Sequence, residues 1–327
     1  MKKNYLLLIA IVLTNFFLAA RVSAQELSIY EIQYTTDPNG NSPLEGRLID
    51  CTGGIVTHKY GGGQPKLTIQ DPNFSTGWGA IQVKDWQSGA PLINKAAIGD
   101  WVKLTNVFVE EYRGNTTLQC LAEFSPQLTV ISRSNSLPEP LVVDVNEIAA
   151  PEMDAFGDWY VKDHSAEKYE HARLIVRNIV VTAIGHGKSV DNYILHDSMD
   201  VNDPNRCCWA ADYMNEDKTV DYHPYVLVGQ HFCSVQGILE QYMRISSGWD
   251  YYQLVTTNSG DFIISQTADF DNDCDVDFDD FGCFARLWLS EKAFDEEDSC
   301  ATADLTGDKF IDLNDLAEFS WHWLIGK

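Results

Sequence analysis

The residues best suited to chemistry are aspartates near the C-terminal end of the chain. A twelve-residue stretch, DFDNDCDVDFDD at 269–280, recurs as DLTGDKFIDLND at 304–315, an offset of 35 residues. Hard cations such as Ca²⁺ prefer oxygen ligands, and twelve-residue calcium loops supply them from side chains at positions 1, 3, 5, 9 and 12 and from the backbone carbonyl at position 7. Both copies carry oxygen-bearing side chains at the five side-chain positions. The sequence therefore predicts two calcium sites.

The two predicted sites differ in their donors. The first copy is acidic throughout, and its residues at positions 1, 3, 5, 7, 9 and 12 are Asp269, Asp271, Asp273, Asp275, Asp277 and Asp280. The second copy is less acidic, and the corresponding residues are Asp304, Thr306, Asp308, Phe310, Asp312 and Asp315. Because fewer charges weaken a calcium loop, we expect the second site to bind less tightly. A solvated acidic tail without metal is the alternative, but a repeat at a fixed offset favours the metal.

Apolar residues at helical spacing follow each loop, and the helix that they predict must hold the loop in place. The first pattern is Phe281, Phe284, Ala285, Trp288 and Leu289, and the second is Leu316, Phe319, Ser320, Trp323 and Leu324. This duplicated loop-plus-helix unit, with Asp at position 12 and no helix leading into the loop, resembles type I dockerin modules. The resemblance covers residues 267–327. It implies a small calcium-folded domain that docks a secreted protein to a cohesin domain on a scaffold or cell surface.

The repeat departs from the dockerin pattern at two places. Position 6 of a calcium loop prefers Gly for its sharp turn, whereas this chain has Cys274 and Lys309. Dockerins carry partner-reading residues at positions 10 and 11, which here are Phe278, Asp279, Leu313 and Asn314. Since the two pairs differ, a symmetric docking surface is not expected.

The N-terminal end of the chain predicts export. Two lysines precede an apolar run at 5–20, and small residues typical of a cleavage site follow at 22–24. Residues 1–24 therefore have the pattern of a cleaved signal peptide. No later run reaches the roughly twenty apolar residues that a membrane helix needs. We therefore expect a secreted protein, extracellular or attached to the cell surface, with no membrane span in the mature chain.

Eight cysteines in an exported chain favour disulfides over catalytic thiols. Sequence alone does not settle their connectivity. The pairs suggested by position are Cys274 with Cys300, Cys51 with Cys120, and Cys233 with either Cys207 or Cys208.

The formal charge argues against charge-driven binding of nucleic acid. The whole chain carries −25, about half of it in the tail, and no segment is basic. Proteins that bind nucleic acid tightly through charge neutralise phosphates with Lys and Arg.

Residues 25–132 alternate short strand-like runs with Gly, Pro and Asn turns, which predicts a small closed barrel of five strands. The motifs LEGRLIDCTGGIV, TIQDP and IGDWVKLTNVFVEEYRGNTTL resemble the OB-fold domains of secreted bacterial nucleases and surface proteins. Gly46, with Gly53 or Gly54, suits the bent first strand of such a barrel.

A weaker repeat of these motifs at 141–266 predicts a second OB-like barrel, separated from the first by a linker at 133–140. The repeat contains two insertions, one before Arg173 and one at 199–224, and we expect the second insertion to be a loop. The predicted fold is therefore mainly β: two OB-like five-stranded barrels followed by a small α-helical loop-helix domain.

OB barrels bind strands and sugars by stacking them on exposed rings. The rings in or beside predicted loops suggest a ligand surface formed by Trp78, Trp86, Tyr112 and Trp249. Polysaccharide or single-stranded nucleic acid would be the ligand. The alternative is that these rings are core or covering residues.

Two further groups could do chemistry. Zinc could be bound by His223, His231, Cys207, Cys208 and Cys233, although their spacing fits no familiar zinc pattern. An acid, a base and its orienter could come from Asp158, His164 and Asp163 in the first insertion.

The favoured function is a secreted, non-catalytic adaptor. Its calcium-loaded module would dock to a cohesin-type partner while the barrels bind or present an extracellular polymer. The alternatives are an extracellular hydrolase of polysaccharide or nucleic acid with a site in the second barrel's insertions, and barrels that act only as spacers.

Overall fold

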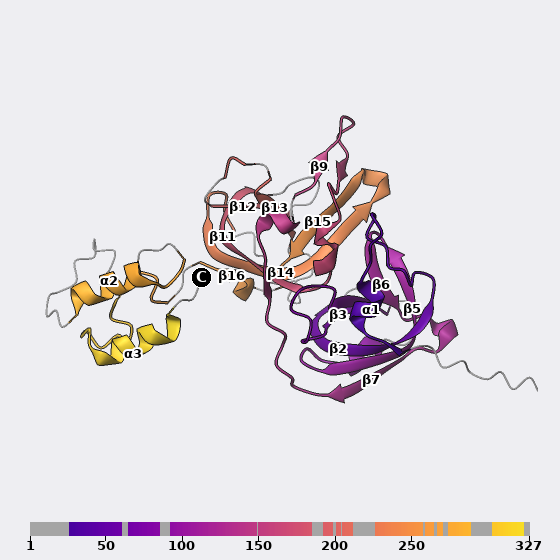
Figure 1. Ribbon diagram of the computed structural model, residues 1–327, viewed down its shortest axis with the longest axis horizontal. Coiled ribbons are helices and arrows are strands. Elements are labelled where there is room, and N and C mark those ends of the chain that lie inside the picture. The colour runs from indigo at the N-terminus through magenta and orange to yellow at the C-terminus, as the bar shows by residue number, and fades with distance from the viewer. Residues whose placement is uncertain are drawn as a thin grey trace, which may run out of the picture.

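The computed structural model has two β-barrels that lie side by side and a helical region set apart from them (Figure 1). The residues it describes are 26–60, 65–85, 92–148, 150–184, 192–198, 201–203, 205–211, 226–257, 259–264, 267–270, 274–288 and 303–323. The predicted signal peptide lies outside these residues. No helix among the described residues is both long and apolar enough to cross a membrane.

The first sheet contains seven strands, five of which close into a ring. Its strands are β1 (Glu26–Leu27), β2 (Leu48–Tyr60), β3 (Lys66–Gln70), β4 (Ala80–Lys84), β5 (Trp101–Tyr112), β6 (Asn115–Gln119) and β7 (Gln127–Ser132). The ring runs β2-β3-β4-β6-β5 and closes where β5 pairs with β2, with β4 and β6 parallel. This Greek-key order is that of the OB-fold, as the sequence predicted.

Closure of the first barrel depends on Gly53. Its φ is +84°, and a Cβ at this position would lie 1.6 Å from the Val102 carbonyl oxygen on β5. The register between β2 and β5 shifts beside it, between Cys51 and Gly54. A residue without Cβ therefore lets the two strands approach while β2 bends, which confirms the bend predicted for the first strand.

The second sheet repeats the same ring order. Its strands are β8 (Leu141–Val142), β9 (Glu152–Met153), β10 (Trp159–Tyr160), β11 (Arg173–Ile184), β12 (Asn192–Asp197), β13 (Cys207–Ala211), β14 (His231–Arg244), β15 (Trp249–Val255) and β16 (Phe262–Ile263). Five of them form the ring β11-β12-β13-β15-β14, which closes through β14 and β11, with β13 and β15 parallel. Each barrel encloses its own apolar core.

Strand β13 corrects the expectation of a loop at 199–224. All five of its residues are buried, and it pairs with β12 on one side and β15 on the other. A strand covered on both faces shows no polar alternation, so the run CCWAA lacked the period-2 signal by which half-buried strands are recognised.

Short helices connect the strands. They are α1 (Ile29–Gln33) and the 3₁₀ turns Leu92–Lys95, Ala122–Phe124, Val145–Ile148, Ser165–Tyr169, Ile245–Ser247 and Ser259–Asp261. The sequence analysis did not anticipate α1, although Ser28 and Glu31 form a capping box at its start.

The helical region contains α2 (Phe278–Leu287) and α3 (Leu313–His322), which begin 35 residues apart. Residues at matching positions of the two copies share one core, namely Val276 with Ile311, Phe284 with Phe319, and Ala268 with Ala303. Each helix is capped by an aspartate with a capping box, Asp277 or Asp312. The predicted duplication is therefore present in the backbone as well as in the sequence.

Candidate calcium loops and an inter-barrel cavity

The second predicted loop brings three carboxylates together. Oxygens of Asp304, Asp308 and Asp315 lie within 4.8 Å of one another, and Asp315 is fully buried. Thr306 donates to Asp315 Oδ1 from its backbone N–H at 2.9 Å and from its hydroxyl at 3.0 Å. Positions 1, 3, 5 and 12 of the loop therefore converge on one small region.

The backbone of the second loop wraps around its first aspartate. The N–H groups of Gly307, Asp308 and Lys309 donate to the Asp304 carboxylate at 2.8, 3.1 and 2.8 Å. This wrapping needs a left-handed residue at position 6, where Lys309 has a φ of +75°. Lys309 thus holds a conformation that glycine adopts more readily.

The first loop repeats the turn at position 6, but its clustered carboxylates come from positions 7, 9 and 12. Cys274 has a φ of +73° and donates its N–H to Asp269 Oδ2 at 3.0 Å, which matches the bond from Lys309 to Asp304. Carboxylate oxygens of Asp275, Asp277 and Asp280 lie within 4.8 Å of one another. The predicted donors Asp271 and Asp273 lie outside the described residues.

The donor chemistry fits a hard cation. The ligand atoms in both clusters are carboxylate oxygens, the type that Ca²⁺ prefers. Asp280 and Asp315, at position 12, are both fully buried, and each accepts backbone N–H bonds from its own loop. Phe310 at position 7 points its side chain outward, 62% exposed, so only its backbone could serve a site.

The four predicted docking residues lie at the exposed start of the two helices. Phe278 is 75% exposed and Leu313 71% exposed, and Asp279 and Asn314 are also exposed. The Phe278 ring packs edge-on against Trp323 at the end of α3, with ring centroids 5.0 Å apart. Phe278, a docking residue predicted in the first loop, therefore contacts the second copy.

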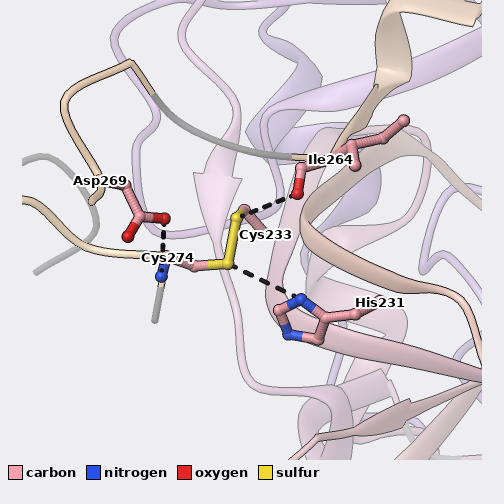
Figure 2. Close-up of a disulfide and its surroundings, with 5 residues drawn as sticks. All are labelled: His231, Cys233, Ile264, Asp269 and Cys274. Atoms are coloured by element: carbon pink, nitrogen blue, oxygen red, sulfur yellow. Dashed lines mark hydrogen bonds between the residues drawn. A yellow bond between two sulfur atoms is a disulfide. The ribbon is translucent and has the colours of Figure 1, made fainter. Parts of the chain in front are cut away.

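A disulfide joins the first loop to the second barrel. Cys274 at loop position 6 is bonded to Cys233 on β14, across 41 residues of sequence. Figure 2 shows the bond between Asp269 on the loop side and His231 on the barrel side. His231 Nδ1 lies 3.9 Å from Cys274 Sγ, and the Ile264 carbonyl oxygen lies 3.5 Å from Cys233 Sγ.

This bond corrects the predicted cysteine pairs. Cys274 does not pair with Cys300, which lies outside the described residues, and Cys233 pairs with neither Cys207 nor Cys208. Cys283 is also disulfide-bonded. Cys51, Cys120, Cys207 and Cys208 are buried and form no disulfide, so the predicted bond between Cys51 and Cys120 is wrong. These thiols pack in the barrels, and desolvation by burial raises the pKa of Cys51 to about 12.

The zinc hypothesis is not supported among the described residues. Cys233 is used in the disulfide, and Cys207 and Cys208 lie on strand β13. The described residues contain no cluster that joins these cysteines to His231 as metal ligands. His223 lies outside the described residues.

The three predicted ligand rings that the structure describes, Trp78, Tyr112 and Trp249, are each in contact with another group. Trp78 is half-buried, has a φ of +62°, and donates its N–H to the Lys168 carbonyl of the second barrel. Its ring meets Tyr34 edge-on at 5.7 Å. Trp78 therefore takes part in the contact between barrels, and Trp86 lies outside the described residues.

Tyr112 and Trp249 each lie beside an arginine. The Arg113 guanidinium is 5.2 Å from the centre of the Tyr112 ring, and the Arg244 guanidinium is 6.0 Å from the centre of the Trp249 ring. Lys84 Nζ lies 3.6 Å from the centre of the Tyr112 ring. Cation–π attraction therefore holds positive groups at both rings.

Those two arginines line a cavity of about 800 Å³ between the barrels. The first barrel contributes Glu111, Arg113 and Gly114 from the β5–β6 hairpin, with Asn39 and Asn41. The second contributes Met243, Arg244, Ser246 and Asp250 around the β14–β15 hairpin, with His164. Its volume is within the usual range of small-ligand sites.

A buried polar layer joins the barrels behind this cavity. Thr116 N–H donates to Glu170 Oε2 at 3.1 Å, and Lys66 Nζ pairs with Glu240 Oε1 at 3.2 Å. Within the second barrel, Tyr252 donates its hydroxyl to Glu167 Oε2 at 2.6 Å. A hydrogen bond and an ion pair therefore join the two barrels in this layer.

Burial perturbs the ionisable groups of this layer. Desolvation raises the pKa of Glu167 to about 8 and raises the pKa of Glu170 well above its ordinary value, with the Glu167 and Glu111 charges adding to the latter. Desolvation, together with the nearby Lys84 and Lys66 charges, lowers the pKa of His171 far below its ordinary value. The layer thus favours neutral Glu167, Glu170 and His171.

The three predicted acid-base residues do not form one group. His164 lines the large cavity, and its Nδ1 is 3.1 Å from the Tyr252 hydroxyl. Asp163 accepts the Ser165 N–H at 2.9 Å and lines a separate cavity of about 30 Å³. His164 is therefore oriented by Tyr252.

Known proteins resemble this chain in fold alone. No family model and no curated protein matches it. The OB domain of MM0293 from Methanosarcina mazei is 16% identical, with a TM-score of 0.22, over 27% of this chain and 76% of that one. The OB domain of Ta0387 from Thermoplasma acidophilum is 15% identical, with a TM-score of 0.22, over 36% of this chain and 95% of that one. Fission yeast Pot1, solved with ssDNA, is 14% identical, with a TM-score of 0.25, over 71% of this chain and 89% of that one. The OB assignment made here rests on the strand order of the two rings.

Sequence reasoning missed the residues that build the cavity. Glu111, Arg113, Arg244 and Asp250 are ordinary charged residues near hairpin turns, and nothing in their spacing marks them as a group. They come together because the two barrels place corresponding hairpins opposite each other. The sequence marked the cavity only indirectly. Tyr112 and Trp249 were predicted as ligand-binding rings, and each lies beside one of the two arginines.

Proposed function

We propose that this protein is an exported adaptor. Two calcium ions would stabilise its C-terminal loop-helix module, the module would dock to a cohesin-type partner on a scaffold or cell surface, and the barrels would bind an extracellular polymer. The observation that supports the proposal is that each of two loops 35 residues apart brings three carboxylates within 4.8 Å of one another, and that both clusters include the aspartate at position 12.

The calcium ions would be held by the aspartates of the two loops. The second would use Asp304, Thr306, Asp308 and Asp315, and the first the corresponding aspartates. The ion supplies positive charge that offsets repulsion among these carboxylates. Because the thirteen aspartates of the tail repel one another, their neutralisation would favour packing of α2 against α3.

The docking surface would be formed by the exposed starts of the helices. Phe278 and Leu313 occupy position 10 of their loops and are more than two-thirds exposed. Large apolar side chains left in water at matching positions favour an interaction surface. Trp321, which is 81% exposed, adds a further apolar group on α3.

Surface plasmon resonance on the full chain tests docking. Binding to an immobilised cohesin-type domain is expected in calcium and is expected to be lost in a chelator. The double variant Phe278→Ala with Leu313→Ala should weaken binding by about tenfold or more, a loss of roughly 1.4 kcal/mol. Ile131→Ala removes a 58% exposed apolar side chain from the first barrel and should change nothing. Equal binding with and without calcium would contradict the proposal.

The hydrolase alternative has one supporting observation. His164, from the first insertion of the second barrel, lines the inter-barrel cavity together with Glu111 and Asp250. Turnover assays on polysaccharides and on single-stranded DNA separate the two functions. Retention of a polymer without cleavage supports the adaptor, whereas cleavage that is lost in His164→Ala supports the hydrolase.

A further inference from the structure

We propose that the cavity between the two barrels is a binding site for a neutral oligosaccharide. This inference rests on the polymer-binding part of the proposed function and gives it a place and a ligand class. The cavity measures about 800 Å³ and takes its walls from both barrels. Neither barrel alone would form it.

Close packing fixes the walls of the cavity relative to each other. At the tip of the β5–β6 hairpin, a Cβ on Gly114 would lie 2.5 Å from the Gln241 side chain of β14. The adjacent Asn115 is buried, and its Nδ2 donates to the Gln241 carbonyl oxygen at 2.5 Å. The hairpin of the first barrel is therefore held against the second barrel, and a ligand would find a preformed space.

The lining contains both hydrogen-bond acceptors and donors. Glu111 and Asp250 supply carboxyl oxygens, and Arg113 and Arg244 supply guanidinium N–H groups. Sugar hydroxyls both donate and accept, so one pyranose ring can satisfy groups of both kinds. Because the lining contains two acids and two arginines, it has no large excess of either charge.

Three of these groups are oriented before a ligand arrives. Glu111 Oε1 accepts from Ser42 N–H at 2.8 Å and from the Thr116 hydroxyl at 2.7 Å. Asp250 Oδ1 accepts from Gln241 Nε2 at 2.6 Å. Arg244 lies over the Trp249 ring, 6.0 Å from its centre. Such preorganisation lowers the entropic cost of binding.

His164 adds a ring of fixed orientation to the lining. Its Nδ1 lies 3.1 Å from the Tyr252 hydroxyl, which also bonds Glu167 Oε2 at 2.6 Å. A sugar hydroxyl can donate to or accept from an imidazole nitrogen, so it suits the other ring nitrogen in either tautomer.

Charge disfavours a phosphate polymer at this place. Nucleic acid binding grows with the number of phosphates neutralised by Lys and Arg. Here Glu111 and Asp250 oppose the two arginines, and the chain as a whole carries −25. A neutral chain of hydroxyl groups avoids this repulsion, which is why we choose saccharide over single-stranded DNA.

Calorimetric titration of the full, oxidised, calcium-loaded chain tests the site. The probes are neutral hexasaccharides with cellulose-type, xylan-type, mannan-type and starch-type linkages, with oligodeoxythymidine of equal length as the phosphate probe. We expect saturable binding of at least one saccharide and none of the oligonucleotide. The double variant Arg113→Gln with Arg244→Gln should weaken that binding by about tenfold or more.

Matched variants keep the test specific. Arg113 and Arg244 are exposed, so their replacement should leave the melting temperature unchanged. Arg47→Gln changes an exposed arginine of the first barrel that does not line the cavity, and it should bind as the unaltered chain does. Asp250→Asn, which keeps the side-chain shape, should also weaken binding.

Three results would overturn the inference: no binding of any of the four saccharides, equal binding by the arginine double variant, or tighter binding of the oligonucleotide. Docking of the cohesin-type partner is measured on the same preparations. Intact docking without saccharide binding contradicts only the cavity assignment. Intact saccharide binding without docking contradicts only the adaptor role.

Discussion

The two loop-helix copies share a backbone but are stabilised by different means. In both, the residue at position 6 is left-handed and donates to the aspartate at position 1, and the aspartate at position 12 is buried. In the first copy position 6 is Cys274, which is bonded to the barrel, whereas in the second it is Lys309, which has no such bond. The same loop geometry therefore occurs both with and without a disulfide at position 6.

The predicted calcium ligands also favour the first copy over the second. The first copy has aspartate at all five side-chain positions, whereas the second has Thr306 at position 3. The first copy therefore combines more carboxylates with a bond from position 6 to the barrel, whereas the second has fewer carboxylates and a lysine at position 6. Substitutions can remove one of these features from a copy or introduce it into the other copy.

Removal of the tether should have the largest effect. The disulfide spans 41 residues, and closing a loop of that size restricts the unfolded chain by about 4 kcal/mol. The double variant Cys233→Ser with Cys274→Ser should lower the free energy of unfolding by about that amount, measured by denaturant titration in calcium. Lys309→Ser, at the equivalent untethered position, should lower it by far less. A loss below about 1 kcal/mol for the cysteine variant would show that the tether adds little.

Removal of the position-12 carboxylate should be next. Asp315→Ala and Asp280→Ala each delete a fully buried donor, and calcium affinity at the altered loop should fall by about a hundredfold, or roughly 2.7 kcal/mol. Because the second copy has no tether, Asp315→Ala should also cost more helicity, measured by circular dichroism. The control is Asp279→Ala, which removes an exposed carboxylate outside the donor positions. Unchanged affinity in both alanine variants at position 12 would contradict the donor assignment.

Transfer of a donor should reduce the difference between the copies. Thr306→Asp gives the second loop the carboxylate that the first has at position 3, and its calcium affinity should rise by about tenfold. Thr306→Ser keeps the hydroxyl that donates to Asp315 and should leave the affinity near its original value. Calorimetric titration measures both. Weaker binding by the aspartate variant would mean that the hydroxyl matters more as a donor to Asp315 than as a ligand.

Relief of backbone strain should have the smallest effect. Lys309 has a φ of +75°, a region that costs a non-glycine residue roughly 1 kcal/mol. Lys309→Gly should therefore raise the melting temperature of the calcium-loaded tail slightly. Lys309→Ala removes the same long side chain but keeps the Cβ, so it should give no such gain. Equal gains from the two variants would locate the effect in the lysine side chain instead.

The sequence predicted those features that local patterns determine. The offset of 35 residues placed both helices, and the glycine pattern placed the bend at Gly53 or Gly54, of which the structure shows Gly53. It did not predict β13, because a strand buried on both faces shows no alternation, nor the bond from Cys233 to Cys274. Both depend on which segments become neighbours in space, and the inter-barrel cavity has the same origin.

The central claim is that calcium binds both loops of the C-terminal region. Calorimetric titration of calcium into the oxidised, chelator-treated full chain tests it most directly, with circular dichroism recorded in parallel. The account predicts two bound ions per chain, the first bound more tightly than the second, and a gain in helical signal as they bind. No heat of binding and no change in helicity, in a chain whose barrels remain folded, would contradict it.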